Sequence, residues 1–243
     1  MTEISFKSDI KPHAACEIWF IRHGETDWNV AQKMQGSTDI PLNAKGHAQA
    51  KALVPSILAA HTSRPFAAVY ATPLTRAQQT GAPLAAALGV DLGVANGLQE
   101  RAFGIIEGEP YETARQGIGR TPSIAAAAQG LFSRDPDYLP PPGANGAAET
   151  LRQFYTRVVD TASTIAARHT GERIIIVVHG GVLDCLWRWA HDMSLAAARD
   201  WNTLNTSMNV IRVNNDAKDC GSARVLAWGL QAGDALPALD DVG

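Results

Sequence analysis

The 243-residue sequence has few cysteines, a small net charge and no long apolar run. Its three cysteines are scattered, and an odd number without a C-x-x-C pair argues against a disulfide framework. A net charge of -3 gives no overall field that would draw the chain to nucleic acid or to a membrane. The apolar runs are far shorter than the roughly 20 residues that span a bilayer, and no apolar signal segment is found near the N-terminus. We therefore expect a cytoplasmic protein with reduced thiols.

Several motifs of well-known chemistries are also missing. The sequence contains no G-x-x-x-x-G-K-[ST] loop, no G-x-G-x-x-G and no G-x-S-x-G elbow. It also lacks H-E-x-x-H and any cluster of His and Asp residues, so no metal site is predicted. Without these motifs, the sequence gives no indication of the common nucleotide-binding proteins, serine hydrolases or zinc hydrolases.

What the sequence does contain is typical of a globular α/β protein: 46% of its residues are hydrophobic and 19% are charged. Strands are predicted over 17–22, 67–72, 90–94, 174–178, 209–213 and 224–228, and helices over 43–60, 74–88 and 182–191. Strands that alternate with helices indicate a layered domain with a largely parallel sheet.

The predicted domain organisation is a polar leader over residues 1–16, a single domain over 17–232 and a tail over 233–243. Residues 104–148 differ from the rest because they are rich in Gly, Ala and Pro. They could be a linker between two domains, but no second core of comparable size follows them. We predict instead a lid-like insertion that folds over one edge of the sheet.

Polar residues follow three of the predicted strands directly. His23, Thr72 and His179 each come just after a strand ends. Since ligands bind at the carboxyl ends of parallel strands, these residues are expected to meet at one edge of the sheet.

The first of these strands ends in Arg22-His23-Gly24, a combination suited to attack on a phosphate. A histidine nucleophile needs one neutral ring nitrogen, with the other nitrogen held by an acceptor, and nearby cations favour the neutral form. Arg22 could also bind the phosphate, Gly24 could bring its N–H close to it, and Asn29 could add a neutral hydrogen bond. The alternative is a core histidine beside an arginine that pairs with a carboxylate.

Two further residues could complete this chemistry. Arg76 lies one turn into a helix that follows a strand, and its guanidinium would match phosphate oxygens; alternatively it is a solvated helix arginine. Glu100 could donate the proton that a leaving alkoxide needs, with Glu107 as a weaker supporting candidate. The alternative for Glu100 is a surface glutamate paired with Arg101.

His179 follows the most apolar strand and precedes Gly180 and Gly181. A second histidine here could hold phosphate oxygens and stabilise charge in the transition state, with Gly180 contributing to the same phosphate site. Structural packing or metal ligation is the alternative for His179.

Together these motifs resemble the histidine phosphatase superfamily, also called the phosphoglycerate mutase-like family. The resemblance runs from about residue 17 to 229 and rests on the order of the motifs as well as on each one. The matching segments are Arg22-His23-Gly24-Glu25-Thr26 with Asn29, Gln35-Gly36 to Gly46, Thr72-Pro73 with Arg76-Ala77 and Thr80, Leu98-Gln99-Glu100 with Phe103-Gly104 and Glu107-Gly108, Val178-His179-Gly180-Gly181, and Asn205-Thr206-Ser207.

The resemblance implies a three-layer α/β/α sandwich with a largely parallel central sheet, of the phosphoglycerate mutase-like kind. It implies a metal-independent, cofactor-free mechanism in which His23 is transiently phosphorylated and Glu100 is the proton donor and later activates water. The implied phosphate pocket consists of Arg22, Arg76, His179 and Asn29. One departure is Gly146-Ala147-Ala148-Glu149-Thr150, where the family usually has Gly-Glu-Ser, so Glu149 takes the glutamate position in an altered loop.

Members of this family are phosphatases or phosphoglycerate mutases. We favour a phosphatase of small phosphorylated metabolites, because the insertion has only Arg115, Arg120 and Arg134 as basic residues and its alanine-rich run, 124–128, suggests an apolar pocket wall. Arg101, directly after Glu100, is a signal for a mutase, since mutases often have arginine there, as do some phosphatases. A 2,3-bisphosphoglycerate-dependent mutase is therefore the alternative, and a non-catalytic phosphate-binding protein is a weaker one. A homodimer stays open.

Overall fold

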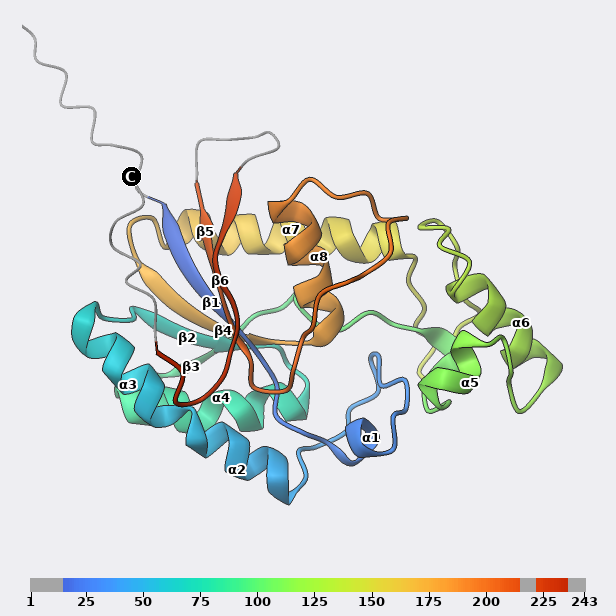
Figure 1. Ribbon diagram of the computed structural model, residues 1–243, viewed down its shortest axis with the longest axis horizontal. Coiled ribbons are helices and arrows are strands. Elements are labelled where there is room, and N and C mark those ends of the chain that lie inside the picture. Colours follow the sequence, from blue (N-terminus) through green and yellow to red (C-terminus); the bar gives the residue numbers. More distant parts are fainter. Residues whose placement is uncertain (1–14, 215–221, 236–243) are drawn as a thin grey trace, which may run out of the picture.

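The computed structural model describes residues 15–214 and 222–235, which form one six-stranded sheet with helices around it (Figure 1). The strands are β1 (Cys16–Arg22), β2 (Ala68–Ala71), β3 (Leu92–Val94), β4 (Arg173–Val178), β5 (Met208–Val213) and β6 (Ala223–Leu230). The helices are α1 (Asp27–Val30), α2 (Ala44–Ala52), α3 (Val54–Ser63), α4 (Thr75–Leu88), α5 (Tyr111–Arg115), α6 (Pro122–Leu131), α7 (Leu151–Arg168) and α8 (Gly180–Ala190), with a 3₁₀ turn at Gly104–Ile106. All six predicted strands are confirmed.

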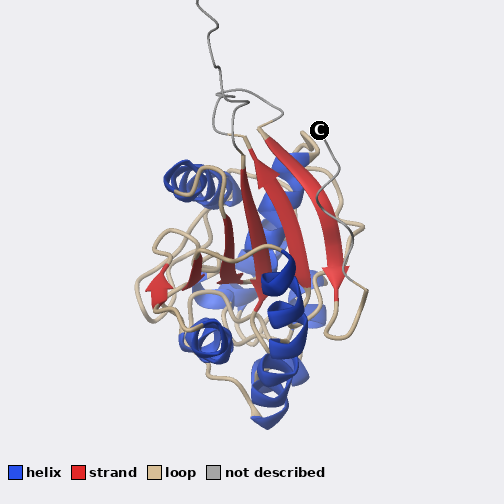
Figure 2. Cartoon of the chain, turned by 90° about the vertical axis from the view of Figure 1, so that its left-hand side faces the viewer, coloured by secondary structure: helices blue, strands red, loops and turns tan. Residues whose placement is uncertain are grey.

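The sheet has the order β3-β2-β4-β1-β5-β6. The first four strands in this order are parallel, while β5 is antiparallel to both of its neighbours. Helices cover both faces, α7 and α8 on one and α2 to α4 on the other (Figures 1 and 2). The three-layer α/β/α sandwich with a largely parallel sheet is therefore confirmed.

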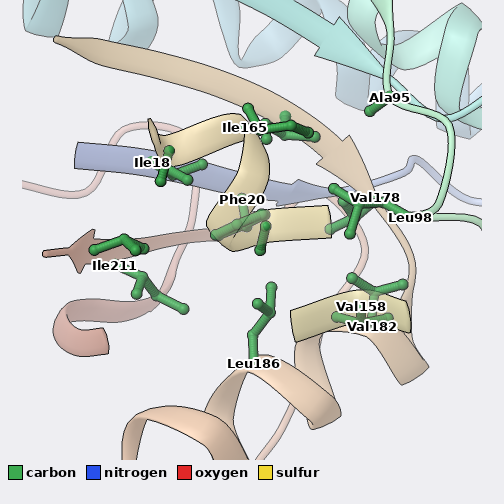
Figure 3. Packing of buried hydrophobic residues seen from close by; sticks show 14 of the residues in the cluster. Ile18, Phe20, Ala95, Leu98, Val158, Ile165, Val178, Val182, Leu186 and Ile211 are labelled. Carbon is green, nitrogen blue, oxygen red and sulfur yellow. The ribbon is translucent and has the colours of Figure 1, made fainter. Parts of the chain in front are cut away.

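Side chains of the two central strands alternate between two buried clusters. Ile18 and Phe20 of β1 pack with α7 and α8 on one face, and Figure 3 shows them beside Val158 and Leu186. Their neighbour Trp19 points to the other face, where it joins the cluster under α3 and α4. Because β4 is buried on both faces as well, its apolar run is continuous rather than alternating.

The predicted helix over 43–60 is two helices. Asn43 caps α2 as expected, with its side chain accepting from the Gly46 N–H. The first helix ends at Ala52, and α3 begins at Val54 with Pro55 in its first turn. A proline lacks the N–H that would continue the first helix, and it suits the start of a second one.

Sequence reasoning missed α7, the longest helix among the described residues. Its buried residues recur at helical spacing, and Thr150 and Gln153 form a capping box at its start. These signals were present in the sequence and would have identified the helix. Its apolar face covers β1 and β4 and completes one of the two clusters.

The predicted insertion, 104–148, contains the 3₁₀ turn, α5 and α6, and lies beyond one end of the sheet (Figure 1). It has a small buried cluster of its own that consists of Met34, Ile106, Ala114, Ala127 and Ala128. Outside the insertion, β1 begins at Cys16, inside the predicted leader, whereas residues 1–14 and most of the predicted tail, 236–243, lie outside the described residues. Among the described helices, none is long and apolar enough to cross a membrane.

Candidate active site

The ends of β1, β2 and β4 bring two histidines and a threonine together. β1 and β4 pair up to Arg22 and Val178, and the next residue on each strand is a histidine. The rings of His23 and His179 lie 5.3 Å apart between centroids. Thr72, which follows β2, places its Oγ1 2.7 Å from Nε2 of His179. The strand ends thus converge at the sheet edge where the sequence predicted a site.

His23 is held in one orientation by its own backbone neighbour. Its Nδ1 lies 2.7 Å from the carbonyl oxygen of Gly24, and since a carbonyl only accepts, Nδ1 carries the hydrogen. The lone pair is then on Nε2. Burial, followed by the nearby charges of Arg76 and Arg22, lowers the pKa of His23 well below 6.5. The ring is therefore neutral, as a nucleophile must be.

Arg22 is half-buried beside this ring. Its Nη1 donates to the Thr203 carbonyl, and its Nε is buried with no hydrogen-bond partner among the described residues. Burial lowers the pKa of Arg22 to about 10, with Glu100 opposing this effect. A buried donor without a partner is costly, so the Nε of Arg22 is a position where an anionic ligand would be stabilised.

Arg76 is fully buried in α4, which excludes the solvated helix arginine. Its Nη1 and Nη2 donate to the carbonyls of Thr38 and Gly36, each at 2.8 Å, while its Nε has no described partner. The sequence predicted a guanidinium that binds two phosphate oxygens. The structure instead shows the fork anchored on the loop 36–38, which fixes the guanidinium at the sheet edge.

Glu100 connects two parts of the site. Its Oε1 accepts from the Arg101 N–H at 2.9 Å, and its Oε2 accepts from the Gly181 N–H at 2.8 Å, in the first turn of α8. A side chain at Gly181 would overlap the Glu100 carboxylate, which explains the glycine there. Arg101 does not form the predicted alternative ion pair; its Nε donates to the Glu149 carbonyl.

Asn29 is held at the same edge of the sheet by Asn205, which was not predicted as a site residue. Its Oδ1 accepts from Thr26 and Asn205, which leaves the Nδ2 group to donate elsewhere. Asn205 also donates to the His23 carbonyl at 2.9 Å. Asn205 therefore positions both His23 and Asn29, and its place just before β5 was the signal in the sequence.

The two glycines predicted to bind phosphate, Gly24 and Gly180, differ in where their backbone groups are directed. The N–H of Gly24 donates to Thr80 Oγ1 at 3.0 Å, so it does not point at an anion as predicted. Gly24 is needed for another reason, since a Cβ there would lie 2.6 Å from the carbonyl oxygen of Gly46. Gly180 begins α8, where the leading N–H groups have no partner within the helix, and it faces the unpartnered Nε of Arg22.

Two charged residues support this site from outside. Glu107 accepts from the backbone N–H groups of Ser37 and Thr38, at 2.8 and 2.9 Å, and so holds the loop that anchors Arg76. Arg157 on α7 was not predicted. Its Nη1 donates to the carbonyls of Gly97 and Gln99, just before Glu100, and its Nε and Nη2 hold both carboxylate oxygens of Glu149.

A pocket of about 550 Å³ opens next to Glu100, between the insertion and α8. It is lined by Arg101, Phe103, Tyr111, Arg115, Leu131, Phe132, Arg134, Leu151, Phe154, Gly181, Asp184, Arg188, Leu195, Ala197, Ala198 and Arg199. The alanine-rich run, 124–128, was expected to form its wall and does not, because Ala127 and Ala128 are buried within the insertion. Two of the three basic residues of the insertion line the pocket instead.

Comparison with known proteins identifies this arrangement. The family model of the histidine phosphatase superfamily (branch 1) matches residues 18–224. The chain belongs to this superfamily. Its fold is the one found in phosphoglycerate mutase, and the described residues contain no group of three His, Cys, Asp or Glu side chains that could hold a metal ion.

Relatives of this chain are named both as phosphoglycerate mutase-like proteins and as phosphatases. Phosphoglycerate mutase-like protein 4 of Arabidopsis thaliana is 31% identical, over 100% of this chain and 94% of the relative. The metal-independent phosphoserine phosphatase of the same plant is 32% identical, over 88% of this chain and 83% of the relative. The crystal structure of an Entamoeba histolytica phosphoserine phosphatase mutant with phosphoserine has a TM-score of 0.68 at 21% identity, over 88% and 96% of the two chains.

Proposed function

We propose that this protein is a metal-independent phosphomonoesterase that acts on a small phosphorylated metabolite through a phosphohistidine at His23. The observation that carries the proposal is the state of His23: neutral, with Nδ1 tied to Gly24 and its lone pair on Nε2, among three buried nitrogens that have no described partner. These are Arg22 Nε, Arg76 Nε and His179 Nδ1. A phosphate would stabilise all three at once.

In the first step, His23 Nε2 attacks phosphorus and the bond from phosphorus to the ester oxygen breaks. Glu100 gives its proton to that oxygen, so the product leaves as a neutral alcohol. Arg22, Arg76 and His179 stabilise the charge on the oxygens of the phosphoryl group in transfer. Both oxygens of Glu100 are oriented by backbone N–H groups, which fixes the carboxyl beside the α8 N-terminus.

In the second step, Glu100, now a carboxylate, takes a proton from water as the water oxygen attacks phosphorus. The bond from phosphorus to Nε2 breaks and inorganic phosphate leaves. Glu100 is protonated again and His23 returns to its neutral form, so the cycle is balanced without an outside acid or base.

The test of the nucleophile uses purified protein with a chelator and a simple aryl phosphate. The protein should release phosphate, and His23→Ala should abolish this while His47→Ala, a histidine exposed on α2, keeps the wild-type rate. Hydrolysis that survives in His23→Ala would overturn the mechanism.

The role of Glu100 has a separate test. With 4-nitrophenyl phosphate, whose leaving group needs no proton, Glu100→Gln should still form the phosphoenzyme but hydrolyse it slowly, because no base activates water. An acid-labile phosphoenzyme should therefore accumulate in a rapid-quench experiment. A Glu100→Gln variant that turns over at the wild-type rate would exclude Glu100 as proton donor and base.

A mutase is the second candidate, favoured by the arginines that line the pocket beside Glu100. A mutase must hold a second anionic group and return the phosphoryl group to the same molecule. Conversion of 3-phosphoglycerate to 2-phosphoglycerate that depends on 2,3-bisphosphoglycerate and is faster than phosphate release would select this function.

A further inference from the structure

The pocket beside Glu100 has an unusual charge balance for a protein with a net charge of -3. Five arginines line it, and its only acidic lining residue is Asp184. The Oδ2 of Asp184 accepts from Nε of Arg188 at 2.9 Å, and the guanidinium of Arg188 also donates to two backbone carbonyls. Asp184 is therefore paired through Oδ2 with a buried arginine, and its single charge does not balance the other four.

The remaining arginines differ in how well they are paired. Arg115 is bound by both oxygens of Glu112. Arg101 donates through Nε to the Glu149 carbonyl. Arg134, on the insertion, makes no hydrogen bond or ion pair with a described residue and has a left-handed backbone, with a φ of 65°. Such a conformation is unfavourable for arginine and is found preferentially at functional positions.

Arg199 faces the pocket from the other side, on the segment that follows α8. Its Nε donates to the Trp201 carbonyl at 3.0 Å and its Nη2 to Thr203 Oγ1. The carboxylate oxygen Oδ1 of Asp184 lies 3.8 Å from Nε, which is too long for a hydrogen bond. Thr203 also accepts from Arg22 through its carbonyl. Arg199 is thus placed between the phosphate-binding end of the site and the pocket, with its charge only weakly compensated.

The apolar part of the lining is aromatic. Phe103 and Phe132 come from the insertion side and Phe154 from α7. Pockets of about 300–1,000 Å³ enclose ligands of drug size, so about 550 Å³ exceeds what a three-carbon acid needs. Aromatic rings and guanidinium groups both favour a flat body in the ligand.

We propose, on the basis of the phosphatase function above, that this pocket takes the alcohol part of the substrate and that this part carries its own anionic group, held between Arg134 and Arg199. The substrate class is then a phosphomonoester with a flat or apolar body larger than three carbons and a second anion. The second anion is a carboxylate or a phosphate, which share the chemistry that arginine recognises.

The experiment compares aryl phosphates that differ in one group. 4-Carboxyphenyl phosphate carries a carboxylate in addition to its phosphate, and 4-carbamoylphenyl phosphate carries an uncharged amide in the same position. The amide compound also has the better leaving group, so leaving-group chemistry alone would favour it over the carboxylate. Wild-type protein should show a kcat/KM at least about tenfold higher for the carboxylate, which corresponds to about 1.4 kcal/mol. Benzene-1,4-diyl bisphosphate shows whether a phosphate is preferred to a carboxylate.

The variants Arg134→Gln and Arg199→Gln should each lower the carboxylate-to-carbamoyl ratio by at least about threefold, and the double variant should bring it close to one. Arg224→Gln, an exposed arginine on β6 outside the pocket, is the matched control and should keep the ratio. Because both probes share the phosphate, damage to the phosphate site through Thr203 would lower both rates and leave the ratio unchanged.

A wild-type ratio near one, or a ratio that both variants leave unchanged, would overturn the proposal while hydrolysis of the neutral probe still supports the phosphatase. If neither probe is hydrolysed, the phosphatase function fails. The pocket is then tested by calorimetry with the product analogues 4-hydroxybenzoate and 4-hydroxybenzamide. Tighter binding of the acid, lost in Arg134→Gln, supports the proposal, and equal binding overturns it.

Discussion

The sheet edge and the insertion beside it contrast in how firmly their residues are held. His23, His179 and Arg76 are at most 3% exposed, whereas Tyr111 and Leu139 in the insertion are 48% and 54% exposed. The two histidines are fixed by strand ends that pair with each other, and Arg76 by its hydrogen bonds to the loop 36–38. The insertion rests on a cluster of five buried side chains. The phosphate chemistry is thus built into the rigid part, and the contacts that choose a substrate lie in the more adaptable part.

The largest expected effect comes from breaking the rigid side. Arg76→Met should lower kcat/KM for 4-carbamoylphenyl phosphate by about 10²–10³-fold, because a buried donor that stabilises the transition state is lost. Asp137→Asn, in the insertion but outside the pocket lining, should change this value less than about threefold, since its partner is the exposed Arg152. Thermal melts confirm that both variants fold. An Arg76→Met variant within tenfold of wild type would contradict the contrast.

Stability should show the same difference between the two regions. Ile176→Ala, at a fully buried position in β4, should lower the free energy of unfolding by about 2–5 kcal/mol through lost burial and a cavity. Leu131→Ala, a partly buried residue of α6, should lower it by only about 1 kcal/mol. Urea titrations measure both. Equal losses would show that the insertion is packed as tightly as the sheet.

Arg157 tests the connection between the regions, since it holds the residues before Glu100 and the carboxylate that ends the insertion. Arg157→Leu should lower kcat by about 10–100-fold with little change in KM, because a small displacement of Glu100 impairs proton transfer. Arg157→Lys should recover part of the loss. A variant that raises KM and keeps kcat would show that Arg157 acts on substrate binding instead of on Glu100.

The smallest effect is a dependence of stability on pH. Burial lowers the pKa of both His23 and His179 well below 6.5, so below this pH the unfolded chain binds protons that the folded chain does not. Stability must therefore fall as the pH drops, by about 1.4 kcal/mol per histidine between about pH 7.5 and 5.5. His179→Gln should remove the share of the decrease that His179 contributes, about 1.4 kcal/mol. An unchanged decrease in His179→Gln would contradict the buried neutral state.

The sequence predicted the sheet and the convergence of its strand ends well, because both follow from apolar periodicity and from the geometry of parallel strands. It could not predict how individual donors are used. Gly24 donates to Thr80 and the Arg76 fork to backbone carbonyls, and these contacts join segments that are dozens of residues apart. They depend on how α4 packs over the loop 36–38.

Arg157 and the pocket wall show the same limit. An arginine on an amphipathic helix has no local signal that separates an exposed residue from one that binds Glu149 and two loop carbonyls. The alanine-rich run was expected to line the pocket from its composition alone, yet which side of a short helix faces a cavity is decided by its partners. The missed α7 was different, since its spacing and capping box were visible in the sequence.

The two carboxylates at the ends of the insertion have a consequence for engineering. Glu107 is bound by Ser37 and Thr38 on the one side, and Glu149 by Arg157 on the other. Between them, the apolar side chains of the insertion pack mainly against one another and Met34. The segment between these anchors can therefore be exchanged for that of another superfamily member as a graft. Such a chimera would acquire a new substrate range while the histidine chemistry stays as it is.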